Sequence, residues 1–264
     1  MSTKRLETDH TDFYEESYRL DVDGERHGRW RQLGAVTKAD HVVRLARSLG
    51  AQAPASVAEI GCGDGAVLDE LGARGFGRTR VGWEISAAAA ALARDRPGVT
   101  EAHVFDGRRV PVPDGAYELV FASHVLEHVP SPGDLVAELA RIGWAVIVEV
   151  PLERNLSARR PSARAASKAA GHVRAFTRRD VKALVRGAGL QVRDELSDPL
   201  PLAFHMFERE SLAARAKAHV KWAARSVIGR LPVAGPRLIT VHYALAATSR
   251  IRDEGAHGGP TSTH

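Results

Sequence analysis

Apolar and polar residues follow one another in blocks that predict strands and helices in turn. Residues 35–49 place their apolar side chains on one helical stripe that Gly50 ends. Other apolar runs are unbroken, which indicates strands covered on both faces, as in a parallel sheet. The predicted strands are 57–60, 79–86, 101–106, 118–123, 144–150, 190–197 and 238–248. The predicted helices are 35–49, 65–75, 86–96, 135–142 and 177–189.

This alternation predicts a doubly wound α/β sheet. Ser86 and Thr177 have the residue types that cap helix N-termini. A basic helical stretch, residues 208–230, separates the last two predicted strands. The expected division is an N-terminal helical cap or lid (1–50), a main domain (51–250) with a helical insertion (201–236), and a disordered tail (251–264).

Composition is that of a globular protein, with 264 residues, 44% of them hydrophobic. The single cysteine, Cys62, excludes a disulfide within the chain and a zinc site built from several cysteines. No apolar run approaches the ~20 residues of a membrane span, and the first residues lack the apolar core of a secretory signal. We therefore expect a cytoplasmic protein, monomeric or homodimeric, without stable membrane insertion.

The net charge of +5 is unevenly distributed. Residues 1–25 carry eight acidic and three basic side chains, whereas residues 154–179 carry eight basic and no acidic ones. Such a basic stretch attracts phosphate, carboxylate, nucleic acid or anionic membrane, or is a solvated surface. Its position after a predicted strand favours an anionic acceptor held by Arg154 or Arg174, with the acidic N-terminal segment as a lid that the acceptor displaces.

A glycine loop between a predicted strand and a helix carries the main chemical signal. Gly61, Gly63 and Ala66 satisfy the dinucleotide pattern G-x-G-x-x-G/A. Glu59, however, precedes the loop and would repel a pyrophosphate, whereas it favours the ammonium and sulfonium of S-adenosylmethionine. Glu84 and Asp106 end the next two strands, where carboxylates accept hydrogen bonds from ribose hydroxyls and from the adenine amino group.

Four segments together resemble class I S-adenosylmethionine-dependent methyltransferases, specifically the type 11 group. The resemblance spans roughly residues 40–196, and its motifs are VAEIGCGDG, VGWEIS, VFDGRRVPVPDGAYELVFASHVLEHV and GHVRAFTRRDVKALVRGAGL. It implies a Rossmann-like sheet of seven strands in the order 3-2-1-4-5-7-6, with the last strand antiparallel. It also implies a cofactor lying across the strand ends.

Carried over position by position, the resemblance implies a cofactor loop, a ribose carboxylate at Glu84, an adenine carboxylate at Asp106 and a methionine end at Ser123 and His124. The implied cofactor-binding residues are Glu59, Gly61, Cys62, Gly63, Gly65, Glu84, Ile85, Asp106, Gly107, Ser123 and His124. Trp83 and His124 depart from the family pattern, where smaller residues are usual.

Histidines supply the candidate proton acceptors. His124, at a strand exit, and His172, on the loop after the fifth strand, are the expected catalytic residues, since histidine titrates in the useful range. Residues 124–128 also match H-x-x-E-H, a zinc-peptidase signature that predicts His124, Glu127 and His128 on one face of a helical turn. Pro130 and the buried strand before the motif argue against a peptidase. No metal is expected, although a divalent ion assisting methyl transfer stays open.

Two segments are expected to cover the site. Aromatic residues at 13–18 and 29–31 form a leading lid or simply dock the N-terminal helices. The insertion closes an apolar acceptor pocket, pairs with a second subunit or lies on a membrane. The predicted function is methyl transfer to an O, N or C nucleophile of a polar or anionic small molecule. RNA methylation and an NAD-dependent oxidoreductase are the alternatives, and no nucleic-acid partner is expected because no RNA-binding module is visible.

Overall fold

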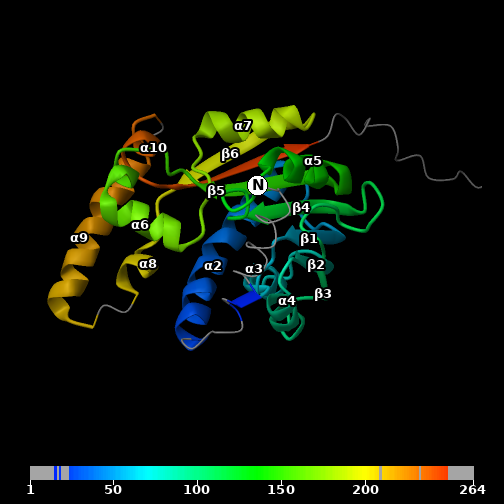
Figure 1. Cartoon of the computed structure of the whole chain (residues 1–264), viewed down its shortest axis with the longest axis horizontal. Helices are drawn as coiled ribbons and strands as arrows, with labels where there is room; N and C mark the ends of the chain where they lie inside the picture. Colours follow the sequence, from blue (N-terminus) through cyan, green and yellow to red (C-terminus); the bar gives the residue numbers. More distant parts are fainter. Residues whose placement is uncertain (1–14, 17, 19–23, 208–209, 232, 249–264) are drawn as a thin grey trace, which may run out of the picture.

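The computed structural model describes residues 15, 16, 18, 24–207, 210–231 and 233–248. Its centre is a seven-stranded sheet of order β3-β2-β1-β4-β5-β7-β6 (Figure 1). Every neighbouring pair is parallel except those that β7 makes with β5 and β6. The predicted fold class and strand order are therefore confirmed.

The strands are β1 (Ser56–Ile60), β2 (Thr79–Glu84), β3 (Glu101–Val104), β4 (Tyr117–Ser123), β5 (Gly143–Pro151), β6 (Gln191–Asp198) and β7 (His242–Thr248). The helices are α2 (Gly24–Ser48), α3 (Ala66–Ala73), α4 (Ala87–Arg94), α5 (Pro132–Ile142), α6 (Pro161–Ala169), α7 (Arg178–Gly187), α8 (Leu202–Met206), α9 (Leu212–Gly229) and α10 (Gly235–Leu238), with a 3-10 turn η1 (Ser157–Arg159).

Helices cover both faces of the sheet, as the unbroken apolar strands predict. On one face α5 and α7 bury Leu139 and Val181 against β4, β5 and β7. On the other, α2 and α3 bury Leu45 and Leu68 against β1, β4 and β5. The two helix layers lie above and below the strands in Figure 1. The sheet is thus a fully covered scaffold whose strand ends are left to carry the site.

Most predicted boundaries agree with the structure to within a few residues, and both predicted caps are present. Ser86 accepts from the Ala89 amide at 3.1 Å, and Thr177 forms a reciprocal capping box with Asp180. The predicted first residues of one helix and one strand were wrong, and one helix was not predicted. Helix α2 begins at Gly24 and not near residue 35, because Gly28 and Gly34 interrupt its apolar stripe without breaking the helix.

The last strand begins at His242, four residues later than predicted, because Pro236 starts the short helix α10 in front of it. The basic segment contains helix α6, which apolar periodicity could not reveal because none of its residues is buried. The predicted tail (251–264) and most of the predicted lid before residue 24 lie outside the described residues.

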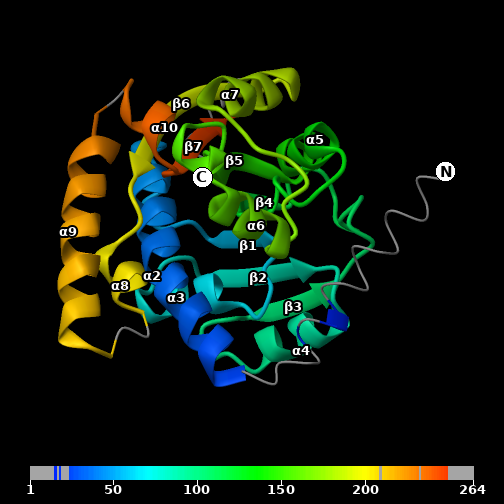
Figure 2. The same cartoon turned by 60° about the vertical axis from the view of Figure 1, so that its left-hand side comes forward.

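Helices α6, α8, α9 and α10 gather at the end of the sheet where the parallel strands finish (Figure 2). The insertion contacts the N-terminal helix there, since the Trp30 ring meets Phe204 at 4.6 Å and Phe207 at 5.2 Å, both edge-on. None of the described helices combines the length and apolar character that crossing a membrane requires.

Candidate active site

A cavity of about 1010 Å³ lies where the parallel strands end, between the strand loops, α2 and the insertion. It adjoins the junction of β1 and β4, from which the strand order runs in opposite directions, the usual ligand site of doubly wound sheets. Ten of the eleven predicted cofactor residues line it, the exception being Gly65, and so do both predicted catalytic histidines.

The glycine loop is shaped by positive φ angles. Gly61 (φ 75°) and Gly63 (φ 54°) both turn in the left-handed region that side chains disfavour. The Gly61 amide donates to the Trp83 carbonyl at 2.7 Å, which fixes the loop to β2. Gly65 instead starts α3, and a side chain there would lie 3.0 Å from Ala93. Its role is helix packing, and it does not line the cavity.

Glu84 is held by backbone amides at the end of β2. Its two oxygens accept from Gly63 at 2.8 Å, from Ile85 at 2.7 Å and from Ser86 at 3.1 Å. Burial raises the pKa of this carboxyl, and the three amides oppose the rise. The carboxylate therefore has a fixed orientation next to the glycine loop.

Glu59 ends β1 as a buried carboxyl, 2% exposed. Its Oε2 atom makes no hydrogen bond with the residues that the structure describes. Burial raises the pKa of Glu59 well above its usual range, and the nearby Lys38 opposes that rise while Asp64 and Glu84 add to it. An unsatisfied buried carboxyl is costly, so this position suits a cationic ligand.

Asp106, by contrast, is exposed on the loop after β3. Its Oδ1 accepts from the Arg108 and Arg109 amides at 2.9 and 3.0 Å, which lower the pKa of this carboxyl. Gly107 turns next to it with φ 76°, and a Cβ there would lie 3.2 Å from Ile85. The third predicted acid thus stands ionised at the open edge of the cavity.

The described part of the leading segment lies against the glycine loop and the start of α4. The Glu15 carboxylate accepts from the Ser86 hydroxyl at 2.7 Å. Tyr18 lines the cavity, and its hydroxyl lies 2.6 Å from where a Cβ on Gly63 would be. Arg31 stacks over the Tyr18 ring at 5.1 Å and donates to Asp64 at 2.9 Å.

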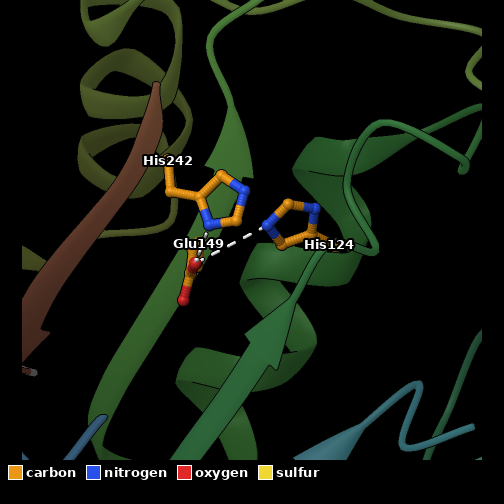
Figure 3. Close-up of side chains that lie close together, drawn as sticks. All are labelled: His124, Glu149 and His242. Carbon is orange, nitrogen blue, oxygen red and sulfur yellow. Dashed lines mark ion pairs between the residues drawn. The ribbon is translucent and has the colours of Figure 1, made fainter. Parts of the chain in front are cut away.

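His124 follows β4 with φ 59°, and it is the one non-glycine residue of the described chain in the left-handed region. His124 itself is therefore not helical, and a single turn follows it, closed by the His128 amide, which donates to the Val125 carbonyl at 2.9 Å. The ring lies between two buried carboxylates, with Nδ1 3.3 Å from Glu127 and Nε2 3.5 Å from Glu149. Figure 3 shows the contact with Glu149.

His172 lies on the loop after α6. Its Nδ1 is 2.9 Å from Glu153 Oε2, which also accepts from the Ser167 hydroxyl at 2.8 Å. The His128 ring meets the His172 ring edge-on at 4.8 Å. The two predicted histidines thus belong to separate groups on the cavity wall, each oriented by a carboxylate.

Sequence reasoning missed the residues that surround His124. Glu149 lies on β5, His242 begins β7, and His41 lies on α2, where its two ring nitrogens are 3.3 Å from Glu149 and 3.5 Å from Asp198. Burial would lower the pKa of His41, but the two carboxylates raise it to about 9. Burial would raise the pKa of Glu149, but the histidines hold it well below its usual range.

The prediction for the basic segment was wrong in its residues. Arg154 pairs with Asp180 at 3.2 Å, Arg174 donates to the Pro130 carbonyl, and neither lines the cavity. Arg160 from the same segment and Arg225 from α9 do line it. Arg154 and Arg174 are thus occupied by contacts outside the cavity.

Comparison with known proteins agrees with this geometry. A family model described as a methyltransferase domain matches residues 28–195, more than half of the chain. The fold and this match define a class I S-adenosylmethionine-dependent methyltransferase, so S-adenosylmethionine is the cofactor. The chain belongs to the methyltransferase domain family, which decides against the oxidoreductase alternative. Among curated protein sequences none matches the chain.

Solved structures share the fold at low sequence identity. A chain from the Haloferax volcanii complex that contains the Trm112 methyltransferase activator is 17% identical, with a TM-score of 0.58 over 89% of this chain and 98% of that one. The [4+2]-cyclase SpnF is 18% identical (TM-score 0.55, 81% of each chain). Geranyl diphosphate C-methyltransferase from Streptomyces coelicolor is 16% identical (TM-score 0.55, 80% and 79%).

Proposed function

We propose that this methyltransferase acts on a small polar or anionic molecule, with the cofactor bound along the β1–β4 side of the cavity and the acceptor beneath the insertion. The observation that carries the acceptor class is the position of Arg160 and Arg225 on the same cavity as the glycine loop.

The cofactor half fits S-adenosylmethionine residue by residue. Glu59 offers a buried, unsatisfied carboxylate oxygen to the ammonium of the methionine part. Glu84 is already oriented by three amides and keeps lone pairs for ribose hydroxyls. Asp106 stands ionised at the open edge, where an adenine amino group can donate to it. Cys62, Ile85 and Gly107 complete the wall around the nucleoside, and Ser123 lies at the methionine end.

The bound cofactor supplies an electrophilic methyl group and leaves as a neutral thioether. The residues of this chain position the acceptor and take its proton when the nucleophile carries one. We assign the role of proton acceptor to His172. Glu153, 2.9 Å from Nδ1, orients that nitrogen as a hydrogen-bond donor, so Nε2 keeps a lone pair that can take the proton. The two ring nitrogens of His124 face Glu127 and Glu149, which favours a different role for that residue.

The acceptor half carries positive charge that favours an anion. Arg225 is partly buried, and burial followed by the charge of Arg160 lowers the pKa of its guanidinium. Two guanidinium groups that repel each other at a cavity wall are stabilised when an anionic group lies between them. A carboxylate or phosphate on the acceptor would serve this purpose.

A labelling experiment tests the acceptor class. Protein incubated with S-adenosylmethionine carrying a tritiated methyl group should label members of a panel of carboxylated and phosphorylated small molecules, and not total RNA. Label appearing in RNA alone would support the RNA-modifying alternative instead.

A matched pair of arginine variants tests the acceptor position. Arg225→Gln should raise KM for the labelled acceptor by about 10-fold or more, since a hydrogen bond to a charged group is lost. Arg154→Gln should leave KM unchanged, because that side chain is exposed and lies away from the cavity. Equal KM in both variants would contradict an anionic acceptor at this place.

A further inference from the structure

A buried group of three histidines surrounds one carboxylate at the end of β5. Glu149 Oε1 lies 3.3 Å from His242 Nδ1, 3.5 Å from His124 Nε2 and 3.3 Å from His41 Nδ1. Glu149 is 1% exposed. Figure 3 shows His124 and His242 directed toward Glu149. Both histidines also line the cavity, so the group is reached from the acceptor side.

The fold itself brings these residues together. Glu149 pairs with Ser123 across β4 and β5, which places it next to His124. His242 pairs with Pro151 across β5 and β7, two positions from Glu149, so both side chains are on the sheet face that α2 covers. Strand pairing therefore fixes Glu149 and His242, and His124 lies one residue beyond the end of β4.

The polar atoms at the centre of this group lie at ion-pair distances from Glu149 without forming regular hydrogen bonds. His124 Nε2, Glu149 Oε1, His242 Nδ1 and His41 Nδ1 are all buried, and none makes a hydrogen bond of normal geometry within the described chain. Buried polar atoms are nearly always hydrogen-bonded, so this group needs an explanation. A bound cation that takes lone pairs from His124, Glu149 and His242 supplies one, with the protonated His41 paired to the same carboxylate.

The distances from Glu149 to the two histidines match those of a metal site, and the three ligand atoms lie within 4.8 Å of one another. In tetrahedral zinc sites the metal lies about 2.0–2.2 Å from nitrogen and oxygen ligands, which sets neighbouring ligand atoms about 3.3–3.5 Å apart. The distances from Glu149 to the two cavity histidines are 3.3 and 3.5 Å. His124 Nδ1 lies 3.3 Å from the buried Glu127, and metal-binding histidines typically give their second nitrogen to a carboxylate.

The backbone at His124 supports a functional role. A residue with a side chain in the left-handed region costs about 1–3 kcal/mol, and such strain persists mainly where the surrounding structure imposes it at a functional site. At φ 59° the ring of His124 is directed between Glu127 and Glu149.

We propose that His124 Nε2, Glu149 Oε1 and His242 Nδ1 bind a divalent transition-metal ion, Zn²⁺ before others, with its open position toward the acceptor cavity. Two imidazoles and one carboxylate form a ligand set that zinc accepts in open sites. Glu127 orients His124, and His41 positions Glu149. The sequence led to the opposite expectation, because His242 is far from His124 along the chain.

A second candidate group, Glu127, His128 and His172, is less suited to this role. His128 Nδ1 lies 3.2 Å from the Gly171 carbonyl, and His172 Nδ1 is taken by Glu153. The experiment must therefore distinguish metal binding by this second group from metal binding by His124, Glu149 and His242.

Zinc titration of chelator-treated full-length protein, followed by calorimetry, tests the site. The wild type should bind one Zn²⁺ per chain, and Co²⁺ in its place should give the visible spectrum of a tetrahedral site. His242→Ala should lose at least 100-fold in zinc affinity. His124→Asn should lose as much and still fold, since asparagine tolerates positive φ. Glu127→Gln should weaken binding about 10–100-fold.

His103→Ala is the matched control, because His103 forms an exposed pair with Glu101 at 2.8 Å and should not affect zinc binding. Absence of stoichiometric zinc in the wild type would overturn the proposal. So would unchanged affinity in His242→Ala and His124→Asn, or loss of zinc in His172→Ala with retention in His242→Ala. Titration with S-adenosylmethionine on the same chelated protein tests the proposed function separately, so the two can fail independently.

Discussion

The two halves of the cavity wall are organised in different ways. On the cofactor side, backbone geometry dominates: positive φ angles shape the glycine loop, and three amides hold the carboxylate of Glu84. On the acceptor side, side chains hold one another, as with His172 and Glu153 or the histidines around Glu149. A wall made of backbone suits a ligand that never changes, whereas a wall made of side chains is easily altered by substitution. We infer that selectivity for the acceptor lies in the second half.

The largest effect that separates the acceptor side of the cavity from the cofactor side is expected for a substitution of His172. His172→Ala should lower kcat by about 10²–10⁴, the usual contribution of a positioned proton acceptor, without changing the Kd for S-adenosylmethionine. Steady-state methyl transfer and calorimetry measure the two quantities. His219→Ala, an exposed histidine of α9, is the control and should change neither. An unchanged kcat in His172→Ala would remove the proton-acceptor role.

The next largest effect is expected on the cofactor side of the cavity, where a substitution should weaken cofactor binding. Gly63→Val should weaken S-adenosylmethionine binding by ~100-fold or more, because a β-branched residue cannot keep φ 54° and its Cβ would meet Tyr18. Gly75→Val is matched to it, since Gly75 has φ 64° but open space around it. Gly75→Val should lower the unfolding free energy by a similar amount and leave the affinity for S-adenosylmethionine unchanged. Calorimetry measures the affinity of both variants for S-adenosylmethionine, and thermal unfolding measures their stability. Equal affinities of the two variants would contradict the placement of the cofactor.

The smallest effect concerns stability and pH at Glu59. Its pKa in the folded protein lies well above the ordinary value of 4.5, so the folded state holds a proton that the unfolded state has lost. This carboxyl therefore lowers the unfolding free energy progressively as pH rises above 4.5. Glu59→Gln removes the effect. It should be more stable than the wild type by about 1–3 kcal/mol at pH 8 but not at pH 4.5, and it should bind S-adenosylmethionine more weakly.

Urea unfolding of the cofactor-free proteins at the two pH values measures this difference. Glu101→Gln, an exposed position on β3, is the control and should show no such pH dependence. A variant that gains stability equally at both pH values would argue against a protonated Glu59.

The same contrast explains what the sequence could predict. The strand order and most of the cofactor positions follow from the family resemblance, whereas both helix caps and the positions of Glu59, Glu84 and Asp106 near strand ends follow from local patterns. Glu149, His41 and His242 do not, because they come from β5, α2 and β7, and only the sheet brings them together. The position of Arg225 on the cavity could not be predicted either, because no local sequence pattern indicates which face of α9 lines the cavity. Helix α6 buries no residue, so its segment has no apolar pattern to read.

The antiparallel strand β7 has a consequence for how the chain is made. It inserts between β5 and β6, yet it is synthesised after both, with α8, α9 and α10 in between. At about 5–20 residues per second, the ribosome needs roughly 3–10 s to add the ~50 residues that follow β6. Throughout that time the apolar edge of β5 has no partner and is open to association with other nascent chains. We expect newly made protein to need chaperone protection in this interval, and truncation before residue 242 to yield aggregates.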